Sequence, residues 1–300
     1  MKLPFFFSHK QSSPLIINNL LTPSWVLGWG KIDQTKENIS GHDPNLIIYH
    51  TQPTISTNQK IIIVGDICLT NLPQLQKKLD ISPTTNPNQT VAELWQNCGL
   101  ETFLLLEGIF ALAIWDKEKR ELWIGRDRAG GRTLYYTVKD STIWIAPRLK
   151  NLSPYHSKEL DLIALRDYLS CAFVPGERTL WQGVKELRPG KFIHFTDKFE
   201  THPQLTYWQP QTQVKNANKP IEYHSQKLRL LLDKIIPEYL PKNQPVGAYL
   251  SGGLDSSCIT ALIAKNHNHP VHTYSIHFGE KLPNELEFSN LVAQHCQTQH

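Results

Sequence analysis

The first 200 residues alternate between short apolar runs and turn residues. The runs expected to form strands are 61–64, 109–115, 121–125, 133–138 and 141–146. Runs of β-branched and aromatic residues bounded by turn signals are typical of strands, and the nearly continuous run 109–115 predicts a strand covered on both faces. Gly65-Asp66 predicts a turn after the first run. The short polar connections between 109 and 146 predict an antiparallel meander.

Beyond residue 220 the apolar residues follow a helical period. Residues 221–240 carry a broad apolar stripe that includes Leu228, Leu231 and Ile235, which predicts an amphipathic helix. A short apolar strand over 246–250 comes next, followed by a loop rich in serine and glycine. A helix over about 256–265 and a strand over 271–276 complete the pattern. This order predicts a βαβ unit and therefore a parallel sheet.

The change of pattern predicts two domains. An α+β domain of antiparallel sheets with helices is expected over 1–205, with its last helix at 161–169. A polar segment with prolines, 206–220, is expected to be a linker. An α/β domain with a parallel sheet is expected over 221–300.

Composition excludes several classes of protein. Hydrophobic residues make up 40% and charged residues 19% of the chain, values that do not indicate disorder or a fibre. The net charge of +4 is spread without a dense basic cluster, so no nucleic-acid partner is predicted. No apolar run approaches the ~18 residues of a membrane span. The five scattered cysteines, without a C-x-x-C pair, are expected to be reduced thiols of a cytosolic protein.

The loop Ser251-Gly252-Gly253-Leu254-Asp255-Ser256-Ser257 is the strongest candidate for chemistry. It joins the carboxyl end of a predicted strand to the amino end of a predicted helix, where unpaired N–H groups suit an anion. Gly252 and Gly253 let the backbone approach a phosphate, and the serines add hydroxyl donors. Asp255 does not suit direct phosphate contact, so we expect a helix cap or an indirect Mg²⁺ partner.

The loop is not a Walker A motif, because it lacks Gly-Lys-Ser/Thr, and it has no G-x-G-x-x-G. It resembles the PP-loop, Ser-Gly-Gly-x-Asp-Ser, of the N-type ATP pyrophosphatases, which cut ATP between the α- and β-phosphates. The alternative is a turn without a ligand, rich in serine and glycine and capped by Asp255.

A wider resemblance covers about residues 60–300. Residues 106–116 (Leu-Glu-Gly-Ile-Phe-Ala-Leu-Ala-Ile-Trp-Asp) and 125–136 (Gly-Arg-Asp-Arg-Ala-Gly-Gly-Arg-Thr-Leu-Tyr-Tyr) look like core strands of the glutaminase domain of asparagine synthetase of the glutamine-hydrolysing type. Residues 246–250 and 273–276 look like the strands beside its PP-loop. The resemblance implies an Ntn-hydrolase-like domain followed by the start of a PP-loop ATP-pyrophosphatase domain.

This resemblance also implies a reaction. A small carboxylate, aspartate or an analogue, would be activated by ATP as an acyl-adenylate with Mg²⁺, and ammonia or another amine would attack it. Leu250 and Ile276 would contact adenosine through backbone and apolar groups. The residues expected to hold the pyrophosphate end are Ser251, Gly252, Gly253, Asp255, Ser256 and Ser257.

The sequence departs from the family at the glutaminase nucleophile. The family has a cysteine directly after the initiator methionine, whose thiol attacks glutamine. Lys2 occupies that position, and no cysteine precedes Cys68. The family's Asn-Gly-Glu turn corresponds to Val64-Gly65-Asp66, which lacks the asparagine. We therefore expect glutamine hydrolysis to be absent.

β-Lactam synthetases and lasso-peptide cyclases also lack the cysteine and use an amine within the substrate, so a cyclase-type amide synthase is the alternative.

The second departure is length, since the family's synthetase domain continues well beyond His300. The sequence alone predicts that residues 1–300 catalyse the complete synthetase reaction weakly or not at all. A second copy of the chain or a complementary C-terminal fragment stays open as partner. A non-catalytic, nucleotide-binding remnant is the third hypothesis.

Other polar residues have ordinary explanations. His267, His269 and His272 cluster around Pro270 without a carboxylate or cysteine at ligand spacing, so a solvated loop is expected rather than a metal site. His295, Cys296 and His300 are expected in a terminal helix without a role. Arg126, Asp127 and Arg128 are expected to make structural ion pairs at a turn.

Overall fold

The computed structural model describes residues 25–30, 45–50, 60–83, 86–196, 203–212, 216–277, 279 and 285–300. The chain divides into two compact units, Met1–Pro210 and Gln211–His300. The predicted linker, 206–220, contains this division, although its extent stays a prediction. Lys2 lies outside the described residues.

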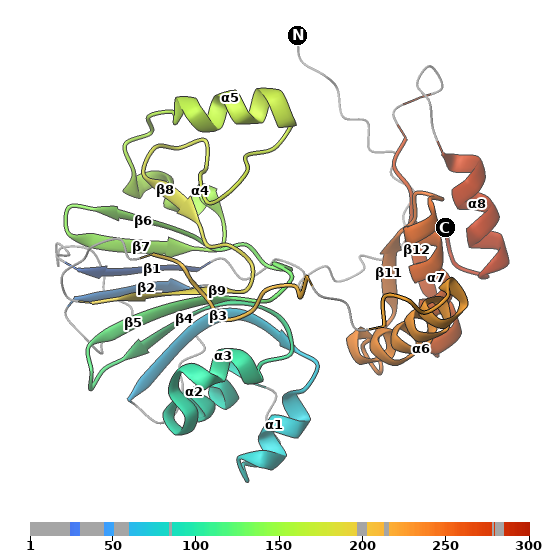
Figure 1. The fold of residues 1–300 in the computed structure, drawn as a ribbon, viewed down its shortest axis with the longest axis horizontal. Helices are drawn as coiled ribbons and strands as arrows, with labels where there is room; N and C mark the ends of the chain where they lie inside the picture. The colour runs from blue at the N-terminus through green and yellow to red at the C-terminus, as the bar shows by residue number, and fades with distance from the viewer. Residues whose placement is uncertain are drawn as a thin grey trace, which may run out of the picture. The chain divides into compact units, whose positions relative to one another are not determined.

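The first unit contains two antiparallel five-stranded sheets (Figure 1). One sheet has the order β2 (Leu46–His50), β1 (Trp25–Gly30), β7 (Thr142–Ala146), β6 (Tyr135–Lys139) and β8 (Val184–Glu186). The other has the order β10 (Leu205–Thr206), β9 (Lys191–Phe195), β5 (Glu121–Arg126), β4 (Gly108–Asp116) and β3 (Ile61–Leu69).

Helices cover the outer faces of this sandwich. The β3–β4 sheet is covered by α1 (Leu72–Lys78), α2 (Pro87–Cys98), the 3₁₀ turn Gly99–Glu101 and α3 (Thr102–Leu105). The other sheet contacts α4 (Leu149–Leu152), which leads through the 3₁₀ turn Ser153–Tyr155 to α5 (Leu162–Cys171). Asp161 caps α5 by accepting from the Ile163 and Ala164 N–H groups, and the Ala164 bond in particular lowers the pKa of this carboxyl. Antiparallel sheets with covering helices confirm the fold class expected for this part of the chain.

Strand β4 belongs to two hydrophobic cores because its side chains alternate between the faces of its sheet. Ala111, Ala113 and Trp115 lie in the core between the sheets, where the Trp29 and Trp115 rings are 4.8 Å apart. Leu112 and Ile114 lie in the core under the helices. The prediction of a strand covered on both faces is confirmed.

Two local predictions for this unit are wrong. Gly65-Asp66 is not a turn, since β3 runs through both residues and Gly65 pairs with Leu112. A Cβ on Gly65 would lie 2.7 Å from the Leu112 Cβ, so this glycine permits close approach of two strands. The predicted meander is also divided: β4 and β5 form a hairpin in one sheet, and β6 and β7 form one in the other. The segment between Arg126 and Tyr135 crosses from sheet to sheet.

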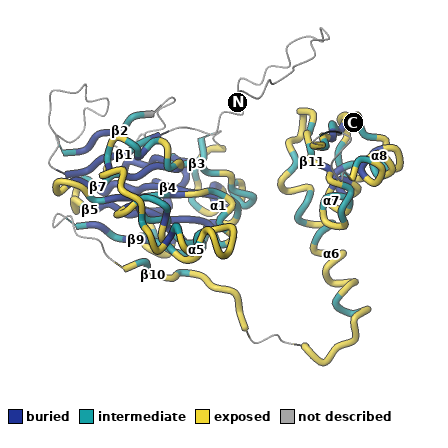
Figure 2. The backbone as a smooth tube through the Cα atoms, turned by 90° about the horizontal axis from the view of Figure 1, so that it is seen from above, coloured by how far each residue is buried: buried dark blue, intermediate teal, exposed yellow. Residues whose placement is uncertain are grey.

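The second unit contains α6 (Ile221–Tyr239), β11 (Val246–Tyr249), α7 (Leu254–Asn266), β12 (Val271–Tyr274) and α8 (Leu286–His295). Strands β11 and β12 are parallel and are joined through α7, so the predicted βαβ unit is confirmed. Figure 2 shows α6 as mostly exposed, and none of its residues is buried. Part of the predicted apolar stripe of α6 is exposed, with Leu228 56% and Leu231 51% exposed, whereas Ile235 is half-buried.

Candidate functional site

The serine- and glycine-rich loop lies between the carboxyl end of β11 and the amino end of α7. The Leu250 N–H donates to the Tyr274 carbonyl over 2.9 Å, which keeps the ends of the two strands together. In parallel sheets with this connection, the crevice at the carboxyl ends of the strands is where ligands bind. The loop therefore has the position that the sequence predicts.

Hydrogen bonds within the loop fix its shape. The Ser251 Oγ accepts from the Gly253 N–H over 3.2 Å and lies 3.0 Å from the Ser256 Oγ. The Ser256 hydroxyl donates to the Gly253 carbonyl over 3.2 Å. The Ser257 Oγ is buried and has no hydrogen-bond partner among the described residues. Two of the three serines, Ser251 and Ser256, thus shape the loop, and the hydroxyl of Ser257 does not take part in these bonds.

Gly252 requires glycine for two separate reasons. Its φ of +89° lies in the left-handed region, which side chains other than glycine rarely adopt. A Cβ at this position would lie 2.6 Å from the Phe288 Cβ and 2.7 Å from the Ser289 backbone nitrogen. The loop is therefore packed tightly against the start of α8.

The first turn of α7 is suited to an anion. Gly253 is the N-cap and provides no side chain to cap the helix, while the Ser257 N–H already bonds to the Gly253 carbonyl. The remaining N–H groups of the first turn point out of the helix end with its partial positive charge. The expectation that Asp255 caps the helix is wrong, because α7 starts at Leu254 and Asp255 is in its first turn. Its carboxylate there is exposed.

The two apolar residues expected near adenosine differ in exposure. Leu250 is 1% exposed, so its side chain belongs to the interior of the unit. Ile276 is 71% exposed and follows β12 on the same side as the loop. Of the two, Ile276 presents an apolar surface to solvent beside the loop.

A hydroxyl and imidazole cluster beside the loop was missed in the sequence. The Ser275 hydroxyl donates to the Leu250 carbonyl over 2.5 Å, and the His300 ring lies between Thr273 and Ser275. The prediction that His300 lies in a helix is wrong, since α8 ends at His295 and the chain then returns to pair Gln299 with His272. Residues 25 to 27 positions apart form the cluster, so no local spacing could reveal it.

The histidines around Pro270 contact backbone and each other. The His267 Nε2 lies 2.8 Å from the Gln244 carbonyl oxygen, and the His267 and His269 rings are 5.5 Å apart. In the part of the chain that the structure describes, no group of three His, Cys, Asp or Glu residues could hold a metal ion. No helix among those residues is long and apolar enough to cross a bilayer.

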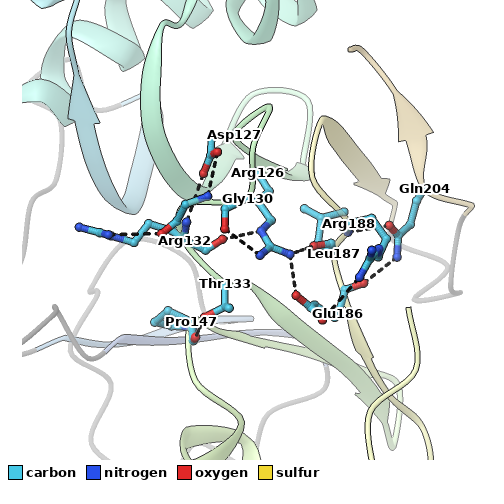
Figure 3. Close-up of polar contacts among 11 residues, drawn as sticks. Arg126, Asp127, Gly130, Arg132, Thr133, Pro147, Glu186, Leu187, Arg188 and Gln204 are labelled. Atoms are coloured by element: carbon cyan, nitrogen blue, oxygen red, sulfur yellow. Dashed lines mark hydrogen bonds and ion pairs between the residues drawn. The ribbon is translucent and has the colours of Figure 1, made fainter. Parts of the chain in front are cut away.

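In the first unit, Arg126 holds together the segment that crosses between the sheets (Figure 3). Its side chain is 6% exposed and forms an ion pair of 2.7 Å with Glu186. It also donates to the carbonyls of Gly130, Arg132 and Leu187. The Tyr207 hydroxyl donates to the Arg126 carbonyl, and burial raises the pKa of this tyrosine. The expected structural ion pair is confirmed for Arg126.

Asp127 fixes the turn that follows. It is 1% exposed, and its carboxylate accepts from four backbone N–H groups, those of Phe110, Ala129, Gly131 and Arg132, over 3.0 to 3.3 Å. Arg128 donates to the Leu104 carbonyl over 2.9 Å. Both side chains bond to backbone, and neither forms the expected ion pair with another residue that the structure describes.

Asp66 stands where the resemblance places the glutamate of the glutamine-binding turn. Its carboxylate forms a 2.5 Å ion pair with the Arg132 guanidinium, and the Asp66 side chain is 14% exposed. The Asp66 carboxylate is therefore engaged by a side chain of its own unit. Cys68, the first cysteine of the sequence, lies two residues later in β3 and is exposed.

Sequence comparisons match both units. The family model of the glutamine amidotransferase domain matches residues 45–208, and that of asparagine synthase matches residues 227–300. Asparagine synthetase [glutamine-hydrolyzing] 1 of Bacillus subtilis is 29% identical over 78% of this chain and 37% of its own length. A putative asparagine synthetase [glutamine-hydrolyzing] 2 of Methanocaldococcus jannaschii is 26% identical over 86% of this chain and 50% of its own. The chain thus spans between about a third and half of these relatives.

Among solved structures, the glutamine phosphoribosylpyrophosphate amidotransferase from B. subtilis, complexed with ADP and GMP, aligns with 87% of this chain and 63% of its own. Its sequence identity is 15% and its TM-score 0.41.

Proposed function

Because the chain belongs to the asparagine synthetase family, a family of amide-forming ligases with a glutamine amidotransferase domain, we propose that it binds Mg²⁺·ATP and serves in the ATP-dependent formation of an amide. In this proposal a small carboxylate, aspartate or an analogue, attacks the α-phosphorus of ATP. The bond between the α-phosphorus and the oxygen bridging to the β-phosphorus breaks, and pyrophosphate leaves. Ammonia or another amine then attacks the acyl carbon, loses a proton and releases AMP.

The geometry of the loop 251–257 is the observation that carries this proposal. The uncapped first turn of α7 would stabilise the negative charge that develops on the departing pyrophosphate. Gly252 and Gly253 let the backbone approach the phosphates, and the buried Ser257 hydroxyl has no hydrogen-bond partner among the residues that the structure describes. Ile276 offers an exposed apolar contact for adenosine.

A magnesium ion fits this site through Asp255. Mg²⁺ usually keeps several waters and binds through one or two carboxylates and the substrate phosphates. Asp255 is an exposed carboxylate in the first turn of α7, the only one that the loop itself carries. The ion would neutralise phosphate charge, and Asp255 would hold it through water.

The direct test is nucleotide binding by the 300-residue chain, measured with a fluorescent ATP analogue and competition by ATP. We expect saturable, magnesium-dependent binding, with a dissociation constant between about 1 μM and 1 mM, the usual range for enzyme substrates. Chelating the magnesium with EDTA should weaken it. Absence of saturable binding at millimolar ATP would disprove the proposed site. ATP–pyrophosphate exchange with aspartate and with larger carboxylates then identifies the activated acid.

We also predict that the chain does not hydrolyse glutamine. Lys2 stands at the position where the family has its nucleophilic cysteine, whose free amine serves as base in the N-terminal-nucleophile reaction. The carboxylate of Asp66 is already paired with Arg132. Incubation with glutamine should therefore release no glutamate above the level of a Cys68→Ser control. Glutamate release that disappears in this control would refute the prediction.

A cyclase-type amide synthase is the second candidate, favoured by the same missing features of the glutaminase. In such an enzyme the amine is part of the activated substrate, so product forms without added ammonia. Dependence of product formation on free ammonia separates the two candidates.

A further inference from the structure

Four side chains connect the end of β12 to the last residues of the chain. The Thr273 Oγ1 lies 2.9 Å from the Thr298 Oγ1 and 2.9 Å from the His300 Nδ1. The other ring nitrogen of His300, Nε2, lies 3.2 Å from the Ser275 Oγ. The Ser275 hydroxyl in turn meets the Leu250 carbonyl over 2.5 Å. A continuous chain of hydrogen bonds therefore runs from Thr298 to the residue that precedes the loop.

The direction of these hydrogen bonds can be assigned. A carbonyl oxygen only accepts, so the single proton of the Ser275 hydroxyl points at Leu250. The Ser275 oxygen must then accept from His300, which requires a proton on the His300 Nε2. At Nδ1 the Thr273 hydroxyl can donate to the ring or accept from it. The Thr298 hydroxyl lies 2.9 Å from the Thr273 Oγ1, and its proton also has the Ala293 carbonyl as an acceptor, 3.5 Å away. The bond from His300 to Ser275 is thus compatible with both the neutral and the charged imidazole.

This direction excludes one chemical role. A serine and a histidine 3.2 Å apart, with a further hydroxyl on the other ring nitrogen, resemble a nucleophile with its base and an orienting group. A base must accept the proton of the nucleophile, whereas the Ser275 hydroxyl donates its proton to the Leu250 carbonyl and the Ser275 oxygen accepts from His300. The cluster is arranged to hold a position.

The hydrogen bonds of this cluster hold the backbone that precedes the candidate nucleotide loop. Leu250 ends β11, and Ser251 is the first residue of the loop. The Ser275 bond joins this end of β11 to the end of β12, beside the backbone bond from Leu250 to Tyr274. Residues 298–300 are themselves fixed by backbone bonds, from the Thr273 N–H to the Gln299 carbonyl and from the Gln299 N–H to the Val271 carbonyl.

We propose that His300 is a positioning residue for the nucleotide loop: it holds the Ser275 hydroxyl on the Leu250 carbonyl and thereby sets the start of the loop 251–257. This inference rests on the proposed ATP site. It assigns a function to an exposed side chain whose hydrogen bonds among the described residues go to Thr273 and Ser275, and not to the loop or to α7. This role requires the hydrogen-bond donor at Nε2, and not the size or shape of the imidazole ring.

Three substitutions separate the donor from the bulk of the side chain. His300→Gln retains an N–H donor close to the place of Nε2, His300→Asn retains a polar group only near Nδ1, and His300→Ala removes both. Loss of a hydrogen bond that fixes the loop should weaken binding of the fluorescent ATP analogue about threefold to tenfold. We expect this loss of affinity for His300→Ala and His300→Asn. The affinity of His300→Gln should stay within about twofold of that of the parent chain. His295→Ala, an exposed histidine of α8, is the matched control and should bind as the parent does.

Combining substitutions tests the path through Ser275. Ser275→Ala should weaken binding as much as His300→Ala, and the double variant should be no weaker than either, because both substitutions interrupt the same path from His300 through Ser275 to Leu250. Circular dichroism establishes that each variant is folded. If His300→Ala does not fold, the difference in ATP-analogue binding between His300→Gln and His300→Asn tests the positioning role.

The outcomes distinguish this inference from the proposed function. If the parent chain binds no ATP, the proposed nucleotide site fails. If the parent binds ATP and the Ala and Asn variants bind equally well, the positioning role is refuted. Equal weakening by Gln, Asn and Ala also refutes it, since that result shows a requirement for the ring and not for the Nε2 donor.

Discussion

Replacing Asp127 by alanine should lower the free energy of unfolding of the first unit by about 3 kcal/mol or more. The carboxylate accepts from four backbone N–H groups while only 1% of the residue is exposed. Each buried donor left without a partner destabilises a fold by about 1–3 kcal/mol, and water entering the space offsets part of that sum. Figure 3 shows Asp127 at the start of the crossing segment, so its loss releases the connection between the sheets.

Urea unfolding followed by tryptophan fluorescence measures this change, because Trp25, Trp29 and Trp115 lie in the core between the sheets. Asp127→Asn keeps one acceptor oxygen and should fall between the parent and the alanine variant. Glu159→Ala, which removes an exposed carboxylate, is the control and should change stability by less than about 0.5 kcal/mol. A loss below about 1 kcal/mol for Asp127→Ala would show that the four bonds do not hold the turn.

The second large effect is expected at Gly252. Alanine there should weaken ATP binding more than about thirtyfold, because a residue with a Cβ must leave the φ of +89° and move away from Phe288 and Ser289. A displaced loop no longer directs its N–H groups and the first turn of α7 at the phosphates. Titration with the fluorescent ATP analogue measures the loss.

The neighbouring glycine provides a matched comparison. A Cβ on Gly253 would lie 3.4 Å from the Ser251 Oγ, an ordinary contact, and the φ of Gly253 is −70°. Gly253→Ala should therefore weaken binding much less than Gly252→Ala. Circular dichroism shows whether α8, against which Gly252 packs, is still formed. Equal binding by the parent and Gly252→Ala would disprove the claim that this backbone position shapes the site.

The features that the sequence predicted well depend on neighbouring residues. The apolar run of β4 and the strand–loop–helix–strand order of the second unit are local patterns, and the structure contains both. The candidate loop could be found for the same reason, because strand, glycines, serines and helix follow one another directly. A short segment can be predicted from its own sequence when the conformational preference of each residue agrees with the structure around it.

The features that were missed depend on partners distant in the sequence. Gly65 looks like a turn residue until Leu112 is known to pair with it, 47 positions later. The division of the meander between two sheets depends on Arg126, whose partner Glu186 is 60 residues away. Likewise, His300 gains its position only through Thr273 and Ser275. None of these pairings has a spacing that a helix or a strand would repeat.

Strand β4 gives the first unit a property that neither of its cores has alone. The same nine residues place Trp115 in the core between the sheets and Ile114 in the core under the helices. We expect the two cores to unfold together, because loss of either one releases the strand that both require. A substitution on one face of β4 is therefore expected to destabilise the packing on the opposite face as well.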